Sequence, residues 1–196
     1  TFQAQNNQTG SGNFGRLSIN SSGQWSYSMT NAHDEFVAGQ TYSDNFVVTS
    51  ADGTTHSITV QIAGTNDKPT FEIGAGAGDL HATVTTGGSY RLSTSDLSYV
   101  DPDNSPDQVT YTTTATNGVI KKYSDGTPSG TLSTVTSFTA QDVADGKIYF
   151  VHQPSTSSYG SFSVSVEDLN QDVSAPVSQT FNLNVAPVVV SDRKST

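Results

Sequence analysis

The sequence has 196 residues, enough for one or two domains, and its 8 lysines and arginines against 18 aspartates and glutamates give a formal net charge of −10. This acidic balance argues against nucleic acid as a partner, because binding to phosphates needs a basic surface. The absence of cysteine excludes disulfides and thiolate metal sites. No apolar run approaches the roughly 20 residues of a membrane-spanning helix, and no signal peptide opens the chain. We therefore expect a piece of a longer protein that does not insert into a membrane.

Apolar and polar residues alternate with a period of two in the first third of the chain, which predicts β-strands. The predicted strands cover residues 16–20, 24–29, 45–50 and 56–64. Between the last two, the pair Asp52-Gly53 predicts a tight hairpin turn. Short antiparallel strands at this spacing indicate a β-sandwich over residues 1–67.

The stretch Asn66-Asp67-Lys68-Pro69 is polar and rigid and interrupts this alternation. Because proline cannot donate a hydrogen bond to a neighbouring strand, we place a domain boundary between residues 67 and 68.

Alternation then returns and predicts a second β-sandwich over residues 68–187. Its predicted strands cover 89–101, 108–116, 118–123, 130–139, 147–153, 160–168 and 178–187. One short helical turn is expected at 139–147, with Thr139 as its cap and Gly146 at its end. The predicted fold class is therefore all-β, with two tandem antiparallel β-sandwich domains, and residues 188–196 are expected to form a disordered tail.

The acidic stretch "YVDPDNSPDQVTY" (99–111) is the candidate for chemistry. In an extended loop, the spacing of Asp101 and Asp103 places both carboxylates on one face, and Pro102 favours extended geometry for the residue before it. A calcium ion takes about six to eight oxygen ligands, carboxylates among them. Asp-Pro and Asn-Ser-Pro are also ordinary turn formers, so a solvated turn without a ligand remains the alternative.

Other motifs point away from catalysis. The four histidines lack zinc-ligand spacing, and there is no nucleophile-elbow motif, so we predict that the protein is not an enzyme. Trp25 and Tyr27 share a strand face and could stack on a sugar, but packing in the core between two sheets is the favoured prediction for Trp25. Tyr90, Tyr99 and Tyr111 are likewise expected to be packing residues.

The first half resembles a VCBS repeat, a module of very large bacterial surface proteins. The resemblance rests on "GNFGRLSINSSGQWSY" (12–27) and "FVAGQTYSDNFVVTSADGTTHSITVQIAGTND" (36–67), followed by Pro69. The Gly-x-Trp-x-Tyr turn and the terminal Gly-Thr-Asn-Asp are its most specific parts.

The second half resembles a cadherin-like module of the CSPG-repeat type. The matching stretches are "LSTSDLSYVDPDNSPDQVTYTTTATNGVI" (92–120) and "SFTAQDVADGKIYFVHQPSTSSYGSFSVSVED" (137–168). Together the two resemblances imply immunoglobulin- or cadherin-like sandwiches in a calcium-dependent RTX adhesin. Such a protein is exported by type I secretion to the bacterial cell surface, where it acts in cell adhesion and biofilms.

The cadherin-like arrangement implies a Ca²⁺ site at the joint between the modules, with oxygens from Asn66, Asp67, Asp101, Asp103 and Asp168. Neighbouring modules of the same long chain are the expected partners, together with a cell-surface glycan or protein, and the chain is expected to be a monomer. Two alternatives stay open: a glycan- or peptide-binding domain of the adhesin, and an accessory domain of a secreted enzyme that acts on polysaccharides.

Overall fold

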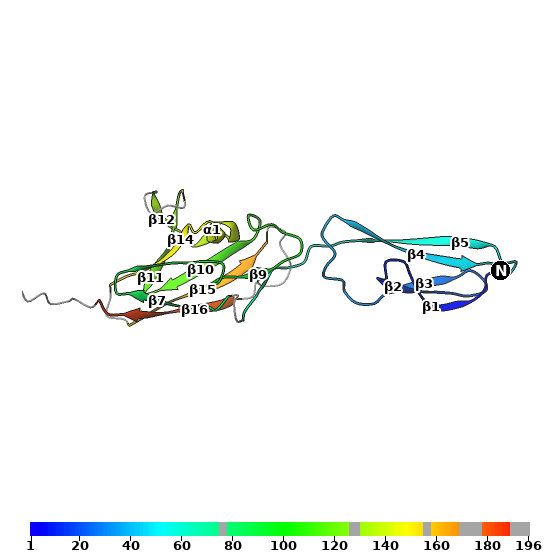
Figure 1. The fold of residues 1–196 in the computed structure, drawn as a ribbon, viewed down its shortest axis with the longest axis horizontal. Helices are drawn as coiled ribbons and strands as arrows, with labels where there is room; N and C mark the ends of the chain where they lie inside the picture. The colour runs from blue at the N-terminus through cyan, green and yellow to red at the C-terminus, as the bar shows by residue number, and fades with distance from the viewer. Residues whose placement is uncertain (75–77, 126–129, 155–157, 169–177, 189–196) are drawn as a thin grey trace, which may run out of the picture. The chain divides into compact units, whose positions relative to one another are not determined.

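Strands form nearly all of the regular structure, as Figure 1 shows. The structure is a computed structural model that describes residues 1–74, 78–125, 130–154, 158–168 and 178–188. The chain divides into two units, Thr1–Asp67 and Lys68–Thr196, which are described one at a time. The predicted tail lies outside the described residues from residue 189 on.

The first unit pairs a three-stranded sheet with a long hairpin. The sheet has the order β1 (Gln5–Thr9), β2 (Gly15–Ile19), β3 (Trp25–Met29), and the hairpin joins β4 (Thr41–Thr49) to β5 (Thr55–Ala63). All of these pairs are antiparallel. The four strands predicted from alternation are present, whereas β1 was not predicted. Asp52 and Gly53 form the predicted hairpin turn, in which Gly53 has a φ of +88° that glycine adopts without steric cost.

Two small clusters fill this unit. The core between the two sheets consists of Leu17, Ile19, Phe46 and Val48. The second cluster is aromatic: Phe36 stacks on Tyr42 at 3.9 Å and on His33 at 4.8 Å between ring centroids, and Phe14 meets Phe36 edge-on. Since so little apolar surface is buried, individual polar contacts carry much of this unit's stability.

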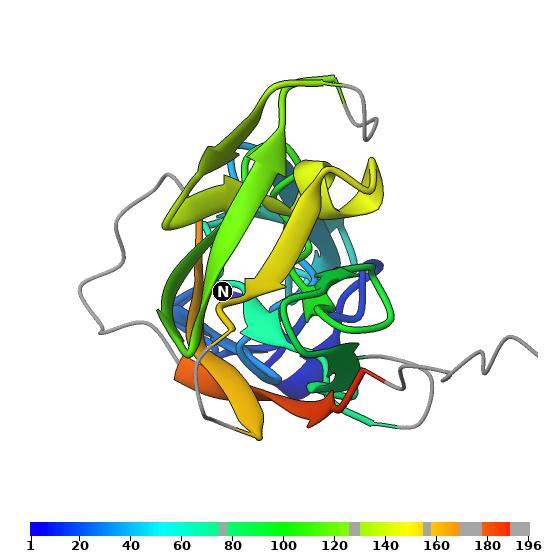
Figure 2. The same ribbon diagram turned by 90° about the vertical axis from the view of Figure 1, so that its left-hand side faces the viewer.

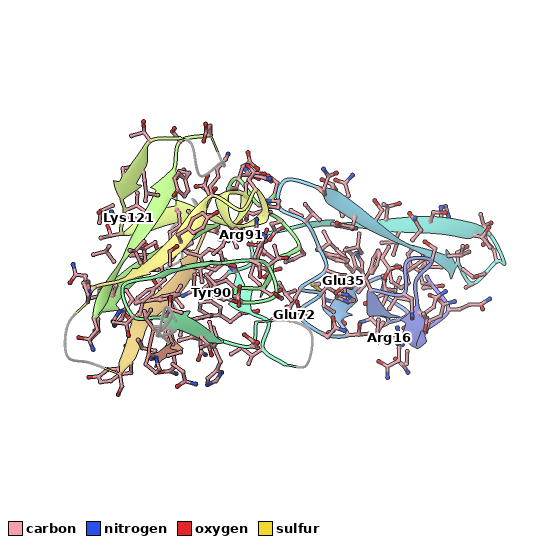
Figure 3. The ribbon with its side chains drawn as sticks, turned by 60° about the vertical axis from the view of Figure 1, so that its left-hand side comes forward. Arg16, Glu35, Glu72, Tyr90, Arg91 and Lys121 are labelled. Atoms are coloured by element: carbon pink, nitrogen blue, oxygen red, sulfur yellow. The ribbon has the colours of Figure 1, made fainter. Side chains whose placement is uncertain are left out.

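His33 is a buried residue of the aromatic cluster whose two ring nitrogens both face acceptors. Nδ1 lies 2.7 Å from Oε1 of Glu35, which Figure 3 labels, and Nε2 lies 2.8 Å from the carbonyl oxygen of Phe14. A carboxylate and a carbonyl only accept, so both nitrogens must carry protons to make both bonds. The hydrogen bond to Glu35 raises the pKa of His33 above the ordinary 6.5, and the bond to Phe14 acts in the same direction.

We therefore expect the first unit to lose stability as the pH rises through the folded-state pKa of His33. The contribution of His33 is fully present below its unfolded pKa of about 6.5 and disappears above the raised folded value. Urea midpoints followed by the fluorescence of Trp25, the single tryptophan of the chain, measure this unit from about pH 6 to about pH 9. Glu35→Gln should flatten the dependence, whereas an unchanged slope in that variant would show that the contact between His33 and Glu35 does not cause the effect.

The second unit is a two-layer sandwich, and Figure 2 shows the layers with β14 in one and β15 and β16 in the other. One sheet has the order β13 (Ser137–Thr139), β10 (Thr110–Thr116), β15 (Tyr159–Glu167), β16 (Ser178–Ala186), β7 (His81–Thr85). The other has the order β12 (Leu132–Thr134), β11 (Gly118–Tyr123), β14 (Ile148–His152), β8 (Ser89–Arg91). A short pair of β6 (Thr70–Phe71) and β9 (Tyr99–Val100) stands beside them.

Alternating side chains from both sheets meet in one core. Its fully buried members include Leu92, Leu97, Val109, Tyr111, Ile120, Ile148, Phe150, Phe162, Val166 and Phe181. Tyr90 and Tyr99 pack against this core, so the three tyrosines predicted as packing residues are confirmed. Tyr90, labelled in Figure 3, also donates a hydrogen bond of 2.8 Å to the buried carboxylate of Asp96.

Several features of this unit differ from the sequence prediction. The strands predicted at 89–101 and 130–139 are each divided into two short strands that belong to different sheets, β8 and β9 in the first case and β12 and β13 in the second. β6 and β7 lie in or next to the stretch that interrupts the alternation, where no strand was predicted. β7 also runs parallel to its neighbour β16, while the other pairs of named strands in the described residues are antiparallel. The prediction of an all-β fold of sandwich type is confirmed.

The helix α1 (Ala140–Ala144) forms where it was predicted and begins with a capping box. Thr139 Oγ1 accepts a bond from the Asp142 backbone, and Asp142 Oδ2 accepts from the Thr139 backbone, each at 3.1 Å. Lys122 from β11 adds an ion pair of 2.6 Å to the same carboxylate. Burial alone would raise the pKa of Asp142, but Lys122 and Thr139 together hold it below the ordinary 3.8.

Asp142→Ala is expected to destabilise the second unit by about 2 kcal/mol, because it removes the cap and leaves the Lys122 ammonium without its anion. Since the pKa is depressed in the folded state, this stabilisation is present above pH 3.8 and is lost as the pH falls through the folded value. Urea denaturation followed by circular dichroism measures the change. Asp145→Ala is the control: it breaks a surface pair with Lys147 and should cost about 0.5 kcal/mol or less. Equal costs would contradict the assignment.

Within the described residues, no helix has both the length and the apolar character needed to cross a membrane.

Candidate metal centre

The acidic loop after β9 is folded around the side chain of Asp101. Its Oδ1 accepts hydrogen bonds from the backbone N–H groups of Asp103 at 2.8 Å and Asn104 at 2.9 Å. The expected extended geometry of this loop is therefore wrong, because an Asx turn closes it directly after Pro102. The turn uses one oxygen of Asp101 and leaves the other available.

Two buried oxygens of this loop have no hydrogen-bond partner: Oδ2 of Asp101 and Oδ1 of Asn104. A buried acceptor without a donor costs free energy, more so when it carries charge. Burial is the main reason that the pKa of Asp101 is raised above 3.8; the two backbone N–H groups oppose this, and the negative charges of Asp103 and Asp168 add to it. A cation bound at this loop would provide a partner for the two buried oxygens and would offset the negative charges around them.

The topology brings Asp168 to the same end of the sheet as this loop. β10 begins directly after the loop, and its first residue, Thr110, pairs with Glu167, the last residue of β15. Asp168 follows at once and is half-buried, whereas the side chain of Glu167 is exposed. Asp103 is also half-buried.

Asn66 and Asp67 end the first unit, and both are half-buried. The side-chain amide of Asn66 donates a hydrogen bond of 3.2 Å to the backbone carbonyl of Asp67. Whether these two residues join the others around one ion stays a prediction, since the two units are described one at a time.

The donor set fits a hard cation such as Ca²⁺, which prefers carboxylate and amide oxygens. The described residues do not, however, hold three or more His, Cys, Asp or Glu side chains close enough together to form a ready-made metal group. The loop therefore offers unpartnered oxygens from Asp101 and Asn104 rather than a closed cage, and a bound ion would need to draw further ligands or water around it.

The second unit, a sandwich with an acidic loop at the end of one sheet, is similar to a known family of domains. The family model described as "Cadherin-like" matches residues 80–185. The chain belongs to the cadherin-like family. Cadherin-like domains are typically extracellular, structural or adhesive, and calcium-binding, and they are not a known enzyme family. No curated protein matches the sequence.

Solved cadherin structures are similar at low identity. The protocadherin gammaB7 EC3-6 cis-dimer is 12% identical, with 96% of this chain and 40% of that chain covered and a TM-score of 0.47. Extracellular cadherin domains 3-6 of protocadherin gamma B2 are 13% identical, with 89% and 38% covered and a TM-score of 0.43. Chicken VE-cadherin EC1-2 is 10% identical, with 95% and 83% covered and a TM-score of 0.42. The cadherin-like chain thus spans about two fifths of the length of the two protocadherin structures.

Proposed function

We propose that the chain is a calcium-binding pair of structural and adhesive modules from a large secreted bacterial surface adhesin of the RTX type. In this proposal, residues 1–67 form a VCBS-like module, residues 68–187 form a cadherin-like module of the CSPG type, and calcium rigidifies the joint between them. The ligands proposed for the ion are Asn66, Asp67, Asp101, Asp103 and Asp168, with the side-chain oxygen of Asn104 added.

The observation that carries the proposal is the pair of buried oxygens without partners, on Asp101 and Asn104. Without an ion, burial is the main cause that raises the pKa of Asp101, and repulsion from the carboxylates of Asp103 and Asp168 adds to it. With an ion, that repulsion is replaced by attraction, and the binding free energy favours the ordered joint. The connection Asn66–Pro69 is short, so an ion held by groups on both sides of it would restrict the angle between the modules.

Calorimetry and small-angle X-ray scattering of the intact chain test this in EGTA and in about 10 mM calcium, a concentration that fills even the weak sites of extracellular modules. We expect calcium to raise the unfolding temperature of the second unit and to narrow the distribution of interatomic distances. A higher unfolding temperature with unchanged scattering would support the site but not the rigid joint. If neither quantity changes, the proposal is wrong.

A further inference from the structure

A groove of about 350 Å³ opens on the first unit, beside the turn that joins β2 to β3. This volume lies within the range of sites that hold small ligands. The side chains that matter here are Asn6, Ser18, Asn20, Gln24, Trp25 and Ser26. We propose that this groove binds a neutral oligosaccharide, with Trp25 as the stacking platform.

Trp25 is 51% exposed, so the prediction that it packs in the core is wrong. It is the first residue of β3, an edge strand, and the core ends at its partner Ile19, which is buried. A single exposed aromatic residue is unremarkable on its own, but this one lies in a groove. Its flat apolar face can cover the C–H face of a sugar ring, while the indole N–H remains available as a donor.

The rest of the groove offers amides and hydroxyls, of which the side chains of Asn20 and Gln24 are held in place. Asn20 Oδ1 accepts bonds of 3.0 Å from the backbone N–H groups of Ser22 and Gln24, and Asn20 Nδ2 donates a bond of 2.9 Å to Gln24 Oε1. These bonds stabilise the turn between β2 and β3, and they fix the oxygen of the Gln24 side-chain amide. Within the described part of the chain, Gln24 Nε2 and the side chains of Asn6 and Ser26 have no hydrogen-bond partner. Donors and acceptors that are already positioned bind a ligand at a smaller entropic cost.

Charge narrows the class of ligand. The groove is lined by uncharged residues. The first unit contains one basic residue, Arg16, against five acidic ones (34, 35, 44, 52 and 67), a net charge of −4. An anionic sugar or phosphate would meet repulsion here, and an apolar protein surface would leave the amides unpaired. A neutral oligosaccharide matches this lining, because its hydroxyl groups can bond to the amides and hydroxyls and its apolar ring faces can stack on Trp25.

Trp25 is the single tryptophan, so its fluorescence reports directly on the groove of the intact protein. We would titrate maltohexaose, cellohexaose and N-acetylchitohexaose, with an anionic oligogalacturonate and an uncharged glycine-serine decapeptide as comparison probes. At least one neutral oligosaccharide should shift the emission with saturation below about 10 mM, in EGTA and in calcium alike. This independence from calcium separates the result from the fate of the proposed calcium site.

Variants then assign the contacts, with binding measured by calorimetry and folding by circular dichroism. Trp25→Ala should abolish binding, Trp25→Phe should retain it in part, and Gln24→Ala should weaken it about five- to tenfold. Met29→Ala is the control, because Met29 is an exposed apolar residue of the same strand outside the groove lining. If Trp25→Ala fails to fold, Gln24→Ala and Asn6→Ala decide. The proposal is overturned if no neutral oligosaccharide binds, if the charged probe or the peptide binds as well as the best of them, or if Gln24→Ala and Asn6→Ala both bind normally.

Discussion

Replacing Asp101 by asparagine is expected to stabilise the calcium-free protein and to abolish its response to calcium. In the calcium-free state, Asp101 Oδ2 is buried without a donor, close enough to the charges of Asp103 and Asp168 to feel their repulsion. Asparagine keeps an oxygen for the backbone N–H groups of Asp103 and Asn104 and replaces the unpaired charged oxygen by a neutral amide. The same change removes the carboxylate that a calcium ion would need most.

The two effects have opposite signs and different sizes. Relief of the unpaired buried charge should raise the free energy of unfolding of the calcium-free second unit by about 1 kcal/mol, or about 4 °C in unfolding temperature. Calcium at a hundred times its dissociation constant should stabilise the wild-type protein by about 2.7 kcal/mol, and this gain should be absent from Asp101→Asn. Wild type would therefore be the less stable protein in EGTA and the more stable one in calcium.

Asp107→Asn is the matched control, because Asp107 lies in the same loop but its side chain is exposed and bonded to Ser105 Oγ. This variant should unfold close to the wild-type temperature in EGTA and keep the calcium response. Differential scanning calorimetry of the three proteins in both buffers gives all six values. A lower unfolding temperature of Asp101→Asn in EGTA would show that the carboxylate stabilises the loop by itself, and the calcium site would then be unnecessary to explain it.

The sequence was most informative where one simple rule acts alone. Period-two alternation predicted β10, β14, β15 and β16, since each of these strands buries one face in the core. The cap of α1 at Thr139 was predicted because its bonds are local, whereas the return bond from Asp142 that completes the capping box was not predicted. β7 could not be predicted in this way: it is short, its pattern is weak, and it is held by a parallel partner about 100 residues away in the chain, β16.

The candidate site shows the same limit. Its carboxylates are visible in the sequence, but the Asx turn that commits one oxygen of Asp101 and leaves the other buried depends on the folded loop. The alternation of apolar and polar residues in its strand predicted that Trp25 packs in the core. That alternation does not indicate whether a strand lies at the edge of its sheet, as β3 does. Buried carboxylates such as Asp44 and Asp96 look in the sequence like any other acidic residue.

Asp44→Ala is expected to unfold the first unit and leave the second unit folded. Asp44 in β4 is fully buried, and no basic group is bonded to it in the described residues. Its carboxylate instead holds the glycine-rich turn before β2: Oδ1 accepts from Gly12 N at 2.8 Å, and Oδ2 accepts from Gly15 N at 3.0 Å and from the Tyr27 hydroxyl at 3.3 Å. The turn approaches so closely that a Cβ at Gly10 would overlap this carboxylate.

The size of the effect follows from what the alanine leaves behind. Two backbone N–H groups would lose a charged acceptor in a place with little access to water, at a cost of about 3 to 5 kcal/mol. A unit of this size with a core of only a few apolar side chains has about that much stability in total. Asp44→Asn keeps the shape and one acceptor, but sets an NH₂ group against a donor, so it should cost about 2 kcal/mol.

Urea titrations of the intact protein separate the two units, because Trp25 fluorescence follows the first and circular dichroism includes the many strands of the second. In Asp44→Ala, the fluorescence should be that of unfolded protein without denaturant, while the transition of the second unit stays in place. Asp34→Ala, which removes an exposed carboxylate from the same unit, should leave both transitions near their wild-type midpoints. If Asp44→Ala instead keeps a fluorescence transition within about 1 kcal/mol of wild type, the turn is held by its backbone contacts, and the buried carboxylate has another role.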